Sequence, residues 1–588
     1  MGAPRRKSPS LPRLHPDSLV TLLGVAVPVL ANAVWVVTQR VGQPLDIDES
    51  GYVRISLVDY RGLQNGGIAA WWHQIIGQPV QAPLAPALAS ILDWVIGLRI
   101  INAFFVSVLA YGVILVATLG LTRNWATPSR SVALFFVACC PVLLAYSRGF
   151  DFAELAAACL ASALYFAHRS HGFTRTLPSL GWGVSLGLML LSRTMTVAFV
   201  PGLLLAVLVP AAARGSWSSL LRIVGGIAMG AAVAATWYAA NLVSVFSYLT
   251  SAGYGPAAAL YGSPRSLFSV GDWFQFLLTN ANLYLYAGEA IFLLVGWLAC
   301  LGIAIQKCAP RDSFDGRPGS LLRQFRGWAD SDTPVAACAI VVVTGLVALM
   351  SSRNGGSGFV APLVVPLVIV ASWGVMRSLQ LVRSRSGPTR GPVLMVPAAV
   401  VIAMTLGSAA LTFLPMSVEA VTSVPLPNGN HLTLWDSAQG TLRRYEDNAG
   451  VPFSSGKGWV AASAFADKEI WAASAAALRP PVAVLAFNAY MINVNTIGLD
   501  SAMHHRGQLQ LAVIYPLPGD YGTAAYLNEI RWIDPIVTVV ATVTGGADEF
   551  QPAVPLSVGT DYVASLHFKP FCRYRLPNGE WLVLWARG

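Results

Sequence analysis

The sequence predicts a polytopic α-helical membrane protein with a soluble α/β domain at its C-terminal end. Of the 588 residues, 55% are hydrophobic and only 11% are charged, and the mean hydropathy is +0.59. Soluble proteins carry about 25% charged residues, so this composition excludes an ordinary soluble protein. Several apolar stretches also reach the roughly 20 residues that a helix needs to cross a bilayer.

The chain divides into three parts by composition. Residues 1–17 are rich in Pro and Arg, which predicts a disordered cytoplasmic tail. Residues 18–414 hold about eleven apolar segments and a long first loop at 39–97. Residues 415–588 gain charge, Asn and Gly, and about 170 residues suffice for one soluble domain. The expected spans are 18–38, 98–121, 130–146, 152–168, 178–192, 195–213, 220–241, 286–306, 334–350, 358–376 and 392–414. Because Ser192-Arg193-Thr194 interrupts 178–213, this pair is expected to be two short helices or one broken helix.

Lys and Arg are concentrated in every second loop of this arrangement. Cytoplasmic loops of membrane proteins carry the excess of positive charge. The alternation therefore places loop 39–97 and the tail 415–588 outside the cytoplasm, in a protein of the plasma (inner) membrane. The net charge of +10 is spread over short loops and forms no basic stripe, which argues against nucleic acid as a partner. The cations of the loops placed inside are Arg5, Arg6, Lys7, Arg13, Arg123, Arg130, Arg169, Arg175, Arg214, Arg222, Lys307, Arg311, Arg317, Arg323, Arg326, Arg377, Arg383, Arg385 and Arg390.

The tail contains short segments typical of strands and helices. Strands are expected at 481–486, 509–515, 536–543 and 581–585, and helices at 463–477 and 521–531. Six of the seven cysteines lie in or beside apolar segments, and Cys572 is alone in the tail. Their spacing predicts neither a disulfide framework nor a metal site.

A run of acidic residues follows the first span directly. Asp46, Asp48 and Glu49 fall within four residues, and Tyr52 comes shortly after them. Charge at a membrane edge is costly, so these carboxylates are predicted to form a functional site. The alternative is a helix start, in which Asp48 and Glu49 supply an N-cap and a first-turn acid, while Asp46 is solvated. Tyr52 is expected either to line the site or to anchor the loop at the membrane interface.

Further motifs follow this run in a fixed order. Amphipathic stretches with Trp71 and Trp72 precede Ala82-Pro83-Leu84-Ala85-Pro86. Later segments are Tyr146-Ser147-Arg148-Gly149-Phe150-Asp151-Phe152-Ala153-Glu154, Gly187–Thr194, Trp237-Tyr238-Ala239-Ala240-Asn241, and Arg353-Asn354-Gly355-Gly356 leading into Phe359-Val360-Ala361-Pro362-Leu363. Together, over residues 18–376, they resemble the GT-C superfamily of integral membrane glycosyltransferases. The resemblance is to the branch of protein O-mannosyltransferases and lipid A aminoarabinose transferases (glycosyltransferase family 39).

The resemblance implies an inverting transfer of a sugar from a polyprenyl-phosphate donor to an envelope glycan, lipid or protein acceptor. Asp48 and Glu49 would be catalytic, because the acceptor hydroxyl must lose a proton to a base. The residues expected to bind donor phosphate or substrate are Arg148, Asp151, Arg193, Arg353 and Tyr52. No cofactor is certain, and a divalent cation at Asp48 and Glu49 is an open alternative. Membrane lipids are further expected partners.

Each of these roles has a structural alternative. Asp151 and Glu154 can begin a helix, and Arg148 and Arg193 can pair with those acids. Arg353 can meet lipid headgroups instead of a substrate. A transporter or flippase of lipid-linked precursors is the alternative function, although it would place its ionisable residues near mid-membrane. A non-catalytic scaffold is a third class, which Asp48→Asn would separate from an enzyme.

Overall fold

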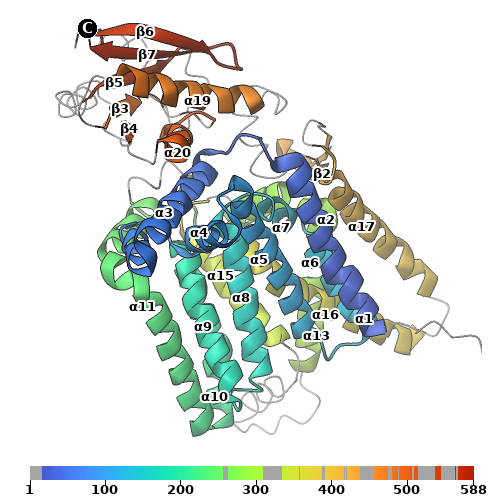
Figure 1. Cartoon of the computed structure of the whole chain (residues 1–588). Helices are drawn as coiled ribbons and strands as arrows, with labels where there is room; N and C mark the ends of the chain where they lie inside the picture. Colours follow the sequence, from blue (N-terminus) through green and yellow to red (C-terminus); the bar gives the residue numbers. More distant parts are fainter. Residues whose placement is uncertain are drawn as a thin grey trace, which may run out of the picture.

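The computed structural model is a bundle of helices with a small mixed α/β domain over one end (Figure 1). We call this end of the bundle the domain end. The structure describes residues 16–588 except for 256–257, 259–261, 309–333, 356–357, 387–390, 416–417, 419, 438–455, 475–479, 486, 488, 490, 506–508, 514–536, 545–562, 565–566 and 588. Residues 1–15, most of the expected disordered tail, lie outside this range, as does the helix expected at 521–531.

The bundle begins with a continuous helical rod from Pro16 to Arg40, in which one π-helical segment joins α1 to α2 and a second follows α2. The rod consists of α1 (Pro16–Thr21), η1 (Leu22–Ala26), α2 (Val27–Trp35) and η2 (Val36–Arg40). The helices that follow are α3 (Ile47–Ile76), α4 (Leu84–Ile96), α5 (Ile100–Leu121), α6 (Thr127–Ala138), α7 (Pro141–Tyr146), α8 (Phe152–Arg169), α9 (Thr176–Ser192), η3 (Thr194–Phe199), α10 (Val200–Arg214), α11 (Trp217–Gly253), α12 (Val270–Asn280), η5 (Ala281–Leu285), α13 (Tyr286–Cys308), α15 (Val335–Ser351), η6 (Ala361–Leu363), α16 (Val364–Ser386) and α17 (Gly391–Leu411).

Helices occupy all of the segments expected to cross the membrane, and they establish a multi-pass membrane protein. Within the described residues, six helices are long and apolar enough to span a bilayer by length and composition. The others are shorter or less apolar, so the total of eleven spans stays a prediction. The six are Leu19–Arg40, Ile100–Leu121, Thr194–Ala212, Trp217–Gly253, Val270–Gln306 and Ala361–Val382.

One expected span has a different local structure, and for the stretch 178–213 the structure decides between the two alternatives left open by the sequence. The single helix expected at 130–146 is wrong: α6 ends before Cys139 and a separate helix, α7, begins at Pro141. Proline favours a first helical turn because it lacks the N–H that would otherwise stay unpaired there. In the stretch 178–213, the backbone is extended at Arg193 (φ −160°, ψ 138°), so α9 and α10 are two helices joined through η3. This break places the Arg193 side chain at the junction of two helices.

The first long loop folds mainly as two helices, α3 and α4, that pack against each other at the domain end (Figure 1). α3 changes direction at Gly67, whose φ of +66° is accessible to glycine at little cost. Trp71 and Trp72 follow this kink, and the Trp71 indole donates a hydrogen bond to Ser90 Oγ on α4 (2.9 Å). The expected amphipathic stretches of the loop are therefore parts of one kinked helix.

The C-terminal domain is built on a mixed five-stranded sheet with the strand order β4-β3-β5-β7-β6. β3 (Val482–Leu485) is parallel to β4 (Gln510–Val513) and β5 (Val539–Val543), whereas β7 (Trp581–Arg587) is antiparallel to β5 and β6 (Phe568–Arg575). Four strands and one helix, α19 (Gly456–Ala473), confirm segments expected from the sequence. β6, helix α20 (Val494–His504) and the hairpin β1 (Val421–Pro425) to β2 (His431–Asp436) were not expected. The hairpin packs on α13 and α17 of the bundle.

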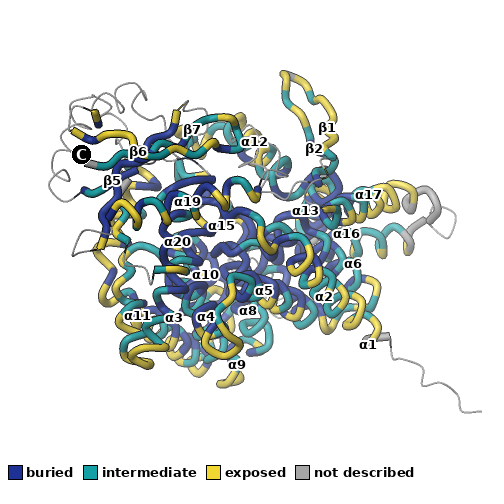
Figure 2. Tube along the Cα trace, turned by 45° about the horizontal axis from the view of Figure 1, so that its top comes forward, coloured by how far each residue is buried: buried dark blue, intermediate teal, exposed yellow. Residues whose placement is uncertain are grey.

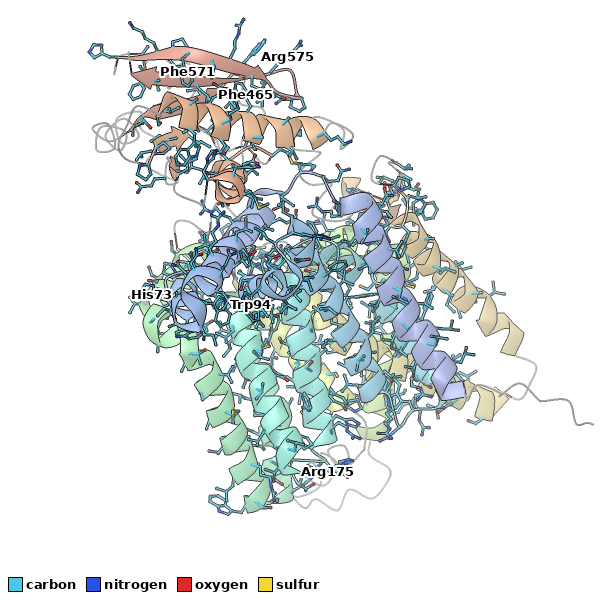
Figure 3. All side chains as sticks on the ribbon, in the orientation of Figure 1. His73, Trp94, Arg175, Phe465, Phe571 and Arg575 are labelled. Carbon is cyan, nitrogen blue, oxygen red and sulfur yellow. The ribbon has the colours of Figure 1, made fainter. Side chains whose placement is uncertain are left out.

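Burial follows the division between a packed interior and a lipid-facing surface (Figure 2). In α5 and α16, which lie inside the bundle, 61% of the most apolar 18-residue stretch is buried. The corresponding share is 17% in the first helix and 28% in α11. The largest core cluster runs through the bundle and continues into α20, since Leu499 and Ala502 belong to it. Figure 3 shows Arg175 at the bundle end opposite the C-terminal domain, where the alternation of charge places a cytoplasmic loop.

Candidate active site at the domain end of the bundle

The acidic run forms the first turn of α3. Asp46 is the N-cap: its Oδ1 accepts hydrogen bonds from the backbone N–H groups of Asp48 (2.7 Å) and Glu49 (2.9 Å). The Glu49 side chain completes a capping box by accepting from the backbone N–H of Asp46 (3.3 Å). Asp46 is thus a buried capping residue rather than a solvated one, and two of the three acids hold the helix start in place.

Glu49 has its carboxylate committed to structural partners. Its Oε2 forms a buried ion pair with the guanidinium of Arg40, and its Oε1 accepts from the backbone N–H of Phe150 (3.1 Å). Gly149 leaves the necessary room, because a Cβ there would lie 2.6 Å from Glu49 Oε1. Arg40 also donates to the carbonyl oxygen of Pro44 (2.9 Å). Glu49 therefore joins the first helix, α3 and the turn before α8.

Asp48 is the acid of the run whose carboxylate is open to solvent. The surrounding protein nevertheless desolvates the group and raises its pKa above the ordinary value, an effect that the positive charge of Arg193 opposes. An exposed carboxylate is accessible to a substrate, while the protein around it still affects its charge. Asp48 can therefore meet a substrate, and it is close enough to Arg193 to interact with it electrostatically.

Arg193 lies at the junction of α9 and η3 and points toward the first turn of α8. Its Nη1 lies 3.9 Å from Asp151 Oδ1, and its guanidinium lies over the rings of Phe152 and Phe359. Nη1 is buried and makes no hydrogen bond within the described part of the chain. An ion pair at this separation leaves the donor available for a stronger acceptor, such as a phosphate oxygen.

Asp151 caps α8 through a hydrogen bond from the backbone N–H of Phe152 to its Oδ1. Burial raises the pKa of Asp151 to about 7, against the opposing effect of Arg193, and the negative charge of Asp48 contributes to the rise. The helix-cap alternative is thus confirmed for Asp151, and its role in a site stays a prediction. The mutual effects of Asp48, Asp151 and Arg193 place the three side chains in one electrostatic cluster.

A small recess, with room for about one water molecule, lies beside this cluster. Its walls are mostly apolar, and Arg193 is the charged side chain among them: the lining consists of Phe152, Ala153, Ala156, Arg193, Met195, Thr196, Phe199, Gly358, Phe359 and Pro362. Gly358 has a φ of +77°, and a Cβ there would lie 2.7 Å from the Tyr146 ring. Glycine is therefore required at this position both by the backbone and by the close packing.

Tyr52 lines the other side of the cluster. Its ring contacts Phe150 and Phe152, with centroids 6.4 Å and 6.1 Å apart. Burial raises the pKa of the Tyr52 hydroxyl, and the charges of Arg193, Asp151 and Asp48 act on it as well. Tyr52 is thus a buried wall of the site, one helical turn after Asp48, and not an exposed interfacial anchor.

Among the described residues, two of the predicted arginines form no ion pair or hydrogen bond with the acids of this cluster. The Arg148 guanidinium is buried between the rings of Trp35 and Phe413 and donates to Asn32 Oδ1 and to the Thr412 carbonyl oxygen. It therefore joins the first helix to the end of α17. The backbone N–H of Arg353 donates to the Gly253 carbonyl oxygen (3.0 Å), and Arg265 donates to the neighbouring Ser352 carbonyl oxygen (2.7 Å). The start of this loop is fixed against the end of α11.

The sequence reasoning overlooked Arg40 and Arg265. Arg40 had a signal, because it is a cation at the end of a span where the alternation of charge disfavours one. Arg265 follows a stretch without a motif, and nothing in its surroundings distinguishes it. Among the described residues, no three His, Cys, Asp or Glu side chains come together as a metal-binding group. Arg40 and two backbone N–H groups occupy the carboxylate oxygens of Glu49. The carboxylates of the site that remain open to a cation are therefore those of Asp48 and Asp151.

The comparisons with known proteins agree with this architecture. No protein-family model matches the sequence, and no curated protein matches it. The chain is similar in structure to ArnT from Cupriavidus metallidurans bound to undecaprenyl phosphate, with a TM-score of 0.52 at 14% identity over 96% of this chain and 97% of that chain. ArnT in the apo state gives a TM-score of 0.50 with the same identity and coverage. This chain therefore has the fold of the ArnT structures over nearly its whole length.

Proposed function

We propose that this chain is an inverting membrane glycosyltransferase that moves a sugar from a polyprenyl-phosphate donor to a cell-envelope acceptor. The observation that carries the proposal is the position of Arg193. Its buried, unbonded Nη1 lies at an apolar recess and beside the open carboxylate of Asp48. A base, a phosphate-binding cation and apolar walls that suit an isoprenoid chain thus meet in one place.

The proposed transfer needs each of these groups. The acceptor hydroxyl gives its proton to Asp48 as its oxygen forms a bond to the anomeric carbon of the sugar. The bond between that carbon and the phosphate oxygen breaks on the opposite face, so the configuration inverts. The polyprenyl phosphate leaves as an anion, whose developing charge Arg193 stabilises. Arginine suits this role because its guanidinium stays charged and can hold phosphate through two parallel hydrogen bonds.

The similarity to ArnT supports the choice of donor. One of the similar structures is described as bound to undecaprenyl phosphate, a long polyprenyl phosphate. In this chain, Phe152, Phe199 and Phe359 supply aromatic walls of the recess next to the guanidinium. The acceptor, an envelope glycan, lipid or protein, would approach from the side of Asp48 that is open to solvent. Membrane lipids surround the bundle in this proposal.

The orientation of the protein is part of the same proposal. The alternation of Lys and Arg places the domain end outside the cytoplasm, so the C-terminal domain is extracytoplasmic or periplasmic in the plasma (inner) membrane. Transfer would then take place on the outer face. A divalent cation, if the enzyme uses one, would bind Asp48 and Asp151, because the Glu49 carboxylate already has its partners.

A transporter or flippase has less support. Its ionisable residues would lie near the middle of the spans. Glu154 and Glu289 are the buried acids whose helices cross the bundle, and both lie in the first turn of their helices, α8 and α13. The acids of the described bundle are thus concentrated near the domain end, where the Asp48 cluster lies.

The test is a transfer assay with the purified protein in detergent. The lipid-linked sugars that accumulate in cells lacking the protein would be isolated and offered as donor, together with an envelope extract as acceptor. We expect release of polyprenyl phosphate and transfer of the sugar by the wild-type protein but not by Asp48→Asn. The proposal is wrong if no lipid-linked sugar accumulates and the wild-type protein releases no polyprenyl phosphate.

A further inference from the structure

The C-terminal domain packs against α3, the helix that carries Asp48. α20 runs in the same direction as α3, because residues nearer the C-terminal end of one helix contact residues nearer the C-terminal end of the other. Asn495 donates from Nδ2 to the Ile47 carbonyl oxygen (2.7 Å), and Arg61 donates to the Ala502 carbonyl oxygen. Between these contacts, Gly498 lies against Arg54, since a Cβ there would be 2.8 Å from Arg54 Nη1. These contacts run from Asn495 to Ala502, about two turns of α20.

Side chains also cross the boundary in both directions. Ile47 of α3 is buried in the core of the C-terminal domain, together with Trp459 and Ile497. In return, Leu499 and Ala502 of α20 belong to the core of the bundle. Each unit thus completes the hydrophobic core of the other, which fixes the two against each other more firmly than a polar surface contact does.

The hydrogen bond from Asn495 acts on the peptide group that immediately precedes the Asp48 Cα. The carbonyl oxygen of this Ile47–Asp48 peptide accepts from Asn495, and its N–H donates to Asp46 Oδ1 (2.7 Å). Both polar ends of the peptide are therefore held, one by the N-cap of α3 and the other by the C-terminal domain together with the Ser50 hydroxyl, which also donates to the Ile47 carbonyl oxygen (3.2 Å). A peptide held at both ends has little freedom to rotate, so the direction of the Asp48 side chain is set as well.

Asn495 is itself held in place. Asn493, which is fully buried, caps α20 by accepting from the backbone N–H of Asn495 (2.9 Å) and of Thr496 (3.1 Å). On the other helix, Gly51 provides the space, because a Cβ there would lie 3.0 Å from Asn495 Nδ2. A residue with a side chain at position 51 would push the amide away from Ile47.

We propose that Asn495 is a positioning residue for sugar transfer: through the Ile47–Asp48 peptide, the C-terminal domain holds the Asp48 carboxylate toward the acceptor. The inference rests on the proposed function, in which Asp48 is the base. General-base catalysis depends on hydrogen-bond geometry, and a misplacement of about 1 Å can cost about a hundredfold in rate. Asn495 is not among the residues that line the donor recess, so its effect is expected on the reaction step and not on donor binding.

The test compares the full-length Asn495→Ala and Asn495→Asp variants with wild type in the same transfer assay. Aspartate keeps the size of the side chain but cannot donate to the Ile47 carbonyl oxygen. We expect kcat to fall at least about tenfold in both variants, with the donor KM within about twofold of wild type. Asn578→Ala, which removes an amide from the β6–β7 turn of the same domain, is the matched control and should keep the wild-type kcat.

A second measurement does not depend on activity. Amide hydrogen exchange over residues 46–52 should become faster in Asn495→Ala, while exchange in β3, β5 and β7 stays unchanged. If Asn495→Ala does not fold, Gly51→Ala disturbs the same contact from α3 while favouring the helix, and the same loss of kcat is expected.

The outcomes separate the inference from the function on which it rests. A wild-type kcat in Asn495→Ala, with Asp48→Asn inactive, overturns the role of Asn495 and leaves the proposed function intact. An unchanged exchange rate over residues 46–52 also overturns it. If Asp48→Asn is as active as wild type, the proposed function fails, and the positioning role of Asn495 fails with it.

Discussion

Glu49 and Arg40 form an ion pair that is closed to solvent, with side-chain exposures of 4% and 0%. The sequence predicts the same catalytic role for two adjacent acids, Asp48 and Glu49, and this ion pair separates their roles. Glu49 faces inward, holding the end of the first helix against α3, whereas Asp48 is exposed to solvent and interacts electrostatically with Arg193. We therefore assign the catalytic role to Asp48 alone in the proposed reaction and a structural role to Glu49.

Glu49→Gln should destabilise the protein because it leaves the Arg40 guanidinium buried without a counter-charge. Breaking a buried pair in this way costs about 3–5 kcal/mol. Thermal unfolding in detergent should therefore show a large fall in Tm for Glu49→Gln and almost none for Asp48→Asn. Equal melting temperatures for wild type and Glu49→Gln would mean that this pair does not hold the helices together.

Asp48→Asn should abolish transfer and leave the fold and donor binding nearly intact. The amide keeps the shape of the side chain but cannot accept the proton, and general-base catalysis contributes about 10²–10⁴-fold to a rate. The measurement is the transfer rate of the purified variant under saturating donor. A variant that keeps more than about a tenth of the wild-type rate would exclude Asp48 as the base.

The pH dependence of transfer should report the environment of Asp48. Burial raises the pKa of this carboxyl above its usual value of 3.8, and the base must be deprotonated to act. Activity is therefore present above the pKa in the folded protein and is lost as the pH falls through it, so the acidic limb should lie above pH 3.8. Arg193 lowers this pKa, so Arg193→Gln should move the limb to higher pH.

The decisive comparison is the pH profile of kcat/KM for wild type and Arg193→Gln, each normalised to its own maximum. Arg175→Gln, at the opposite end of the bundle (Figure 3), is the matched control and should leave the limb in place. A limb that does not move in Arg193→Gln would show that Arg193 and Asp48 do not interact in the working enzyme.

Arg353→Ala tests the predicted contact with the donor phosphate. A charge-assisted hydrogen bond contributes about 1.5–3 kcal/mol, which corresponds to about ten- to a hundredfold in affinity. The donor KM should rise by this factor in Arg353→Ala and recover only partly in Arg353→Lys, because lysine lacks the forked geometry. Identical donor curves for wild type and Arg353→Ala, measured with a short-chain donor in detergent, would leave Arg353 as a residue that meets lipid headgroups.

The proposed orientation can be checked by labelling single cysteines in intact cells, in a background without the native cysteines. Lys468→Cys lies on α19 of the C-terminal domain, where the native side chain is 82% exposed, and should react with an impermeant reagent. Ser218→Cys lies at the exposed start of α11, at the opposite end of the bundle, and should react only after permeabilisation. Labelling of Ser218→Cys in intact cells would reverse the orientation and the proposed face of transfer.

Much of the site was predictable because its residues are close in sequence or obey the rules of membrane insertion. The run from Asp46 to Tyr52 stands at the end of an apolar segment, and Arg193 interrupts another, so both attract attention by the cost of charge in a membrane. The structure brings Asp48, Tyr52, Asp151 and Arg193 together as one cluster. Among the described residues, Arg148 and Arg353 form no ion pair with that cluster, although their sequence motifs predicted a site role as clearly as the motif of Arg193 did.

The sequence by itself determined that this chain spans a membrane several times, where most of the membrane helices run and which segments carry charge at their ends. These properties depend on local composition, since each span must satisfy its own backbone hydrogen bonds and bury apolar side chains in lipid. Only the tertiary structure decided what each charged group faces. Glu49 meets Arg40 and Phe150, and Asn495 meets Ile47 across 448 residues. Such contacts depend on how distant helices pack, and no local pattern in the chain records which side of a helix a distant segment will cover.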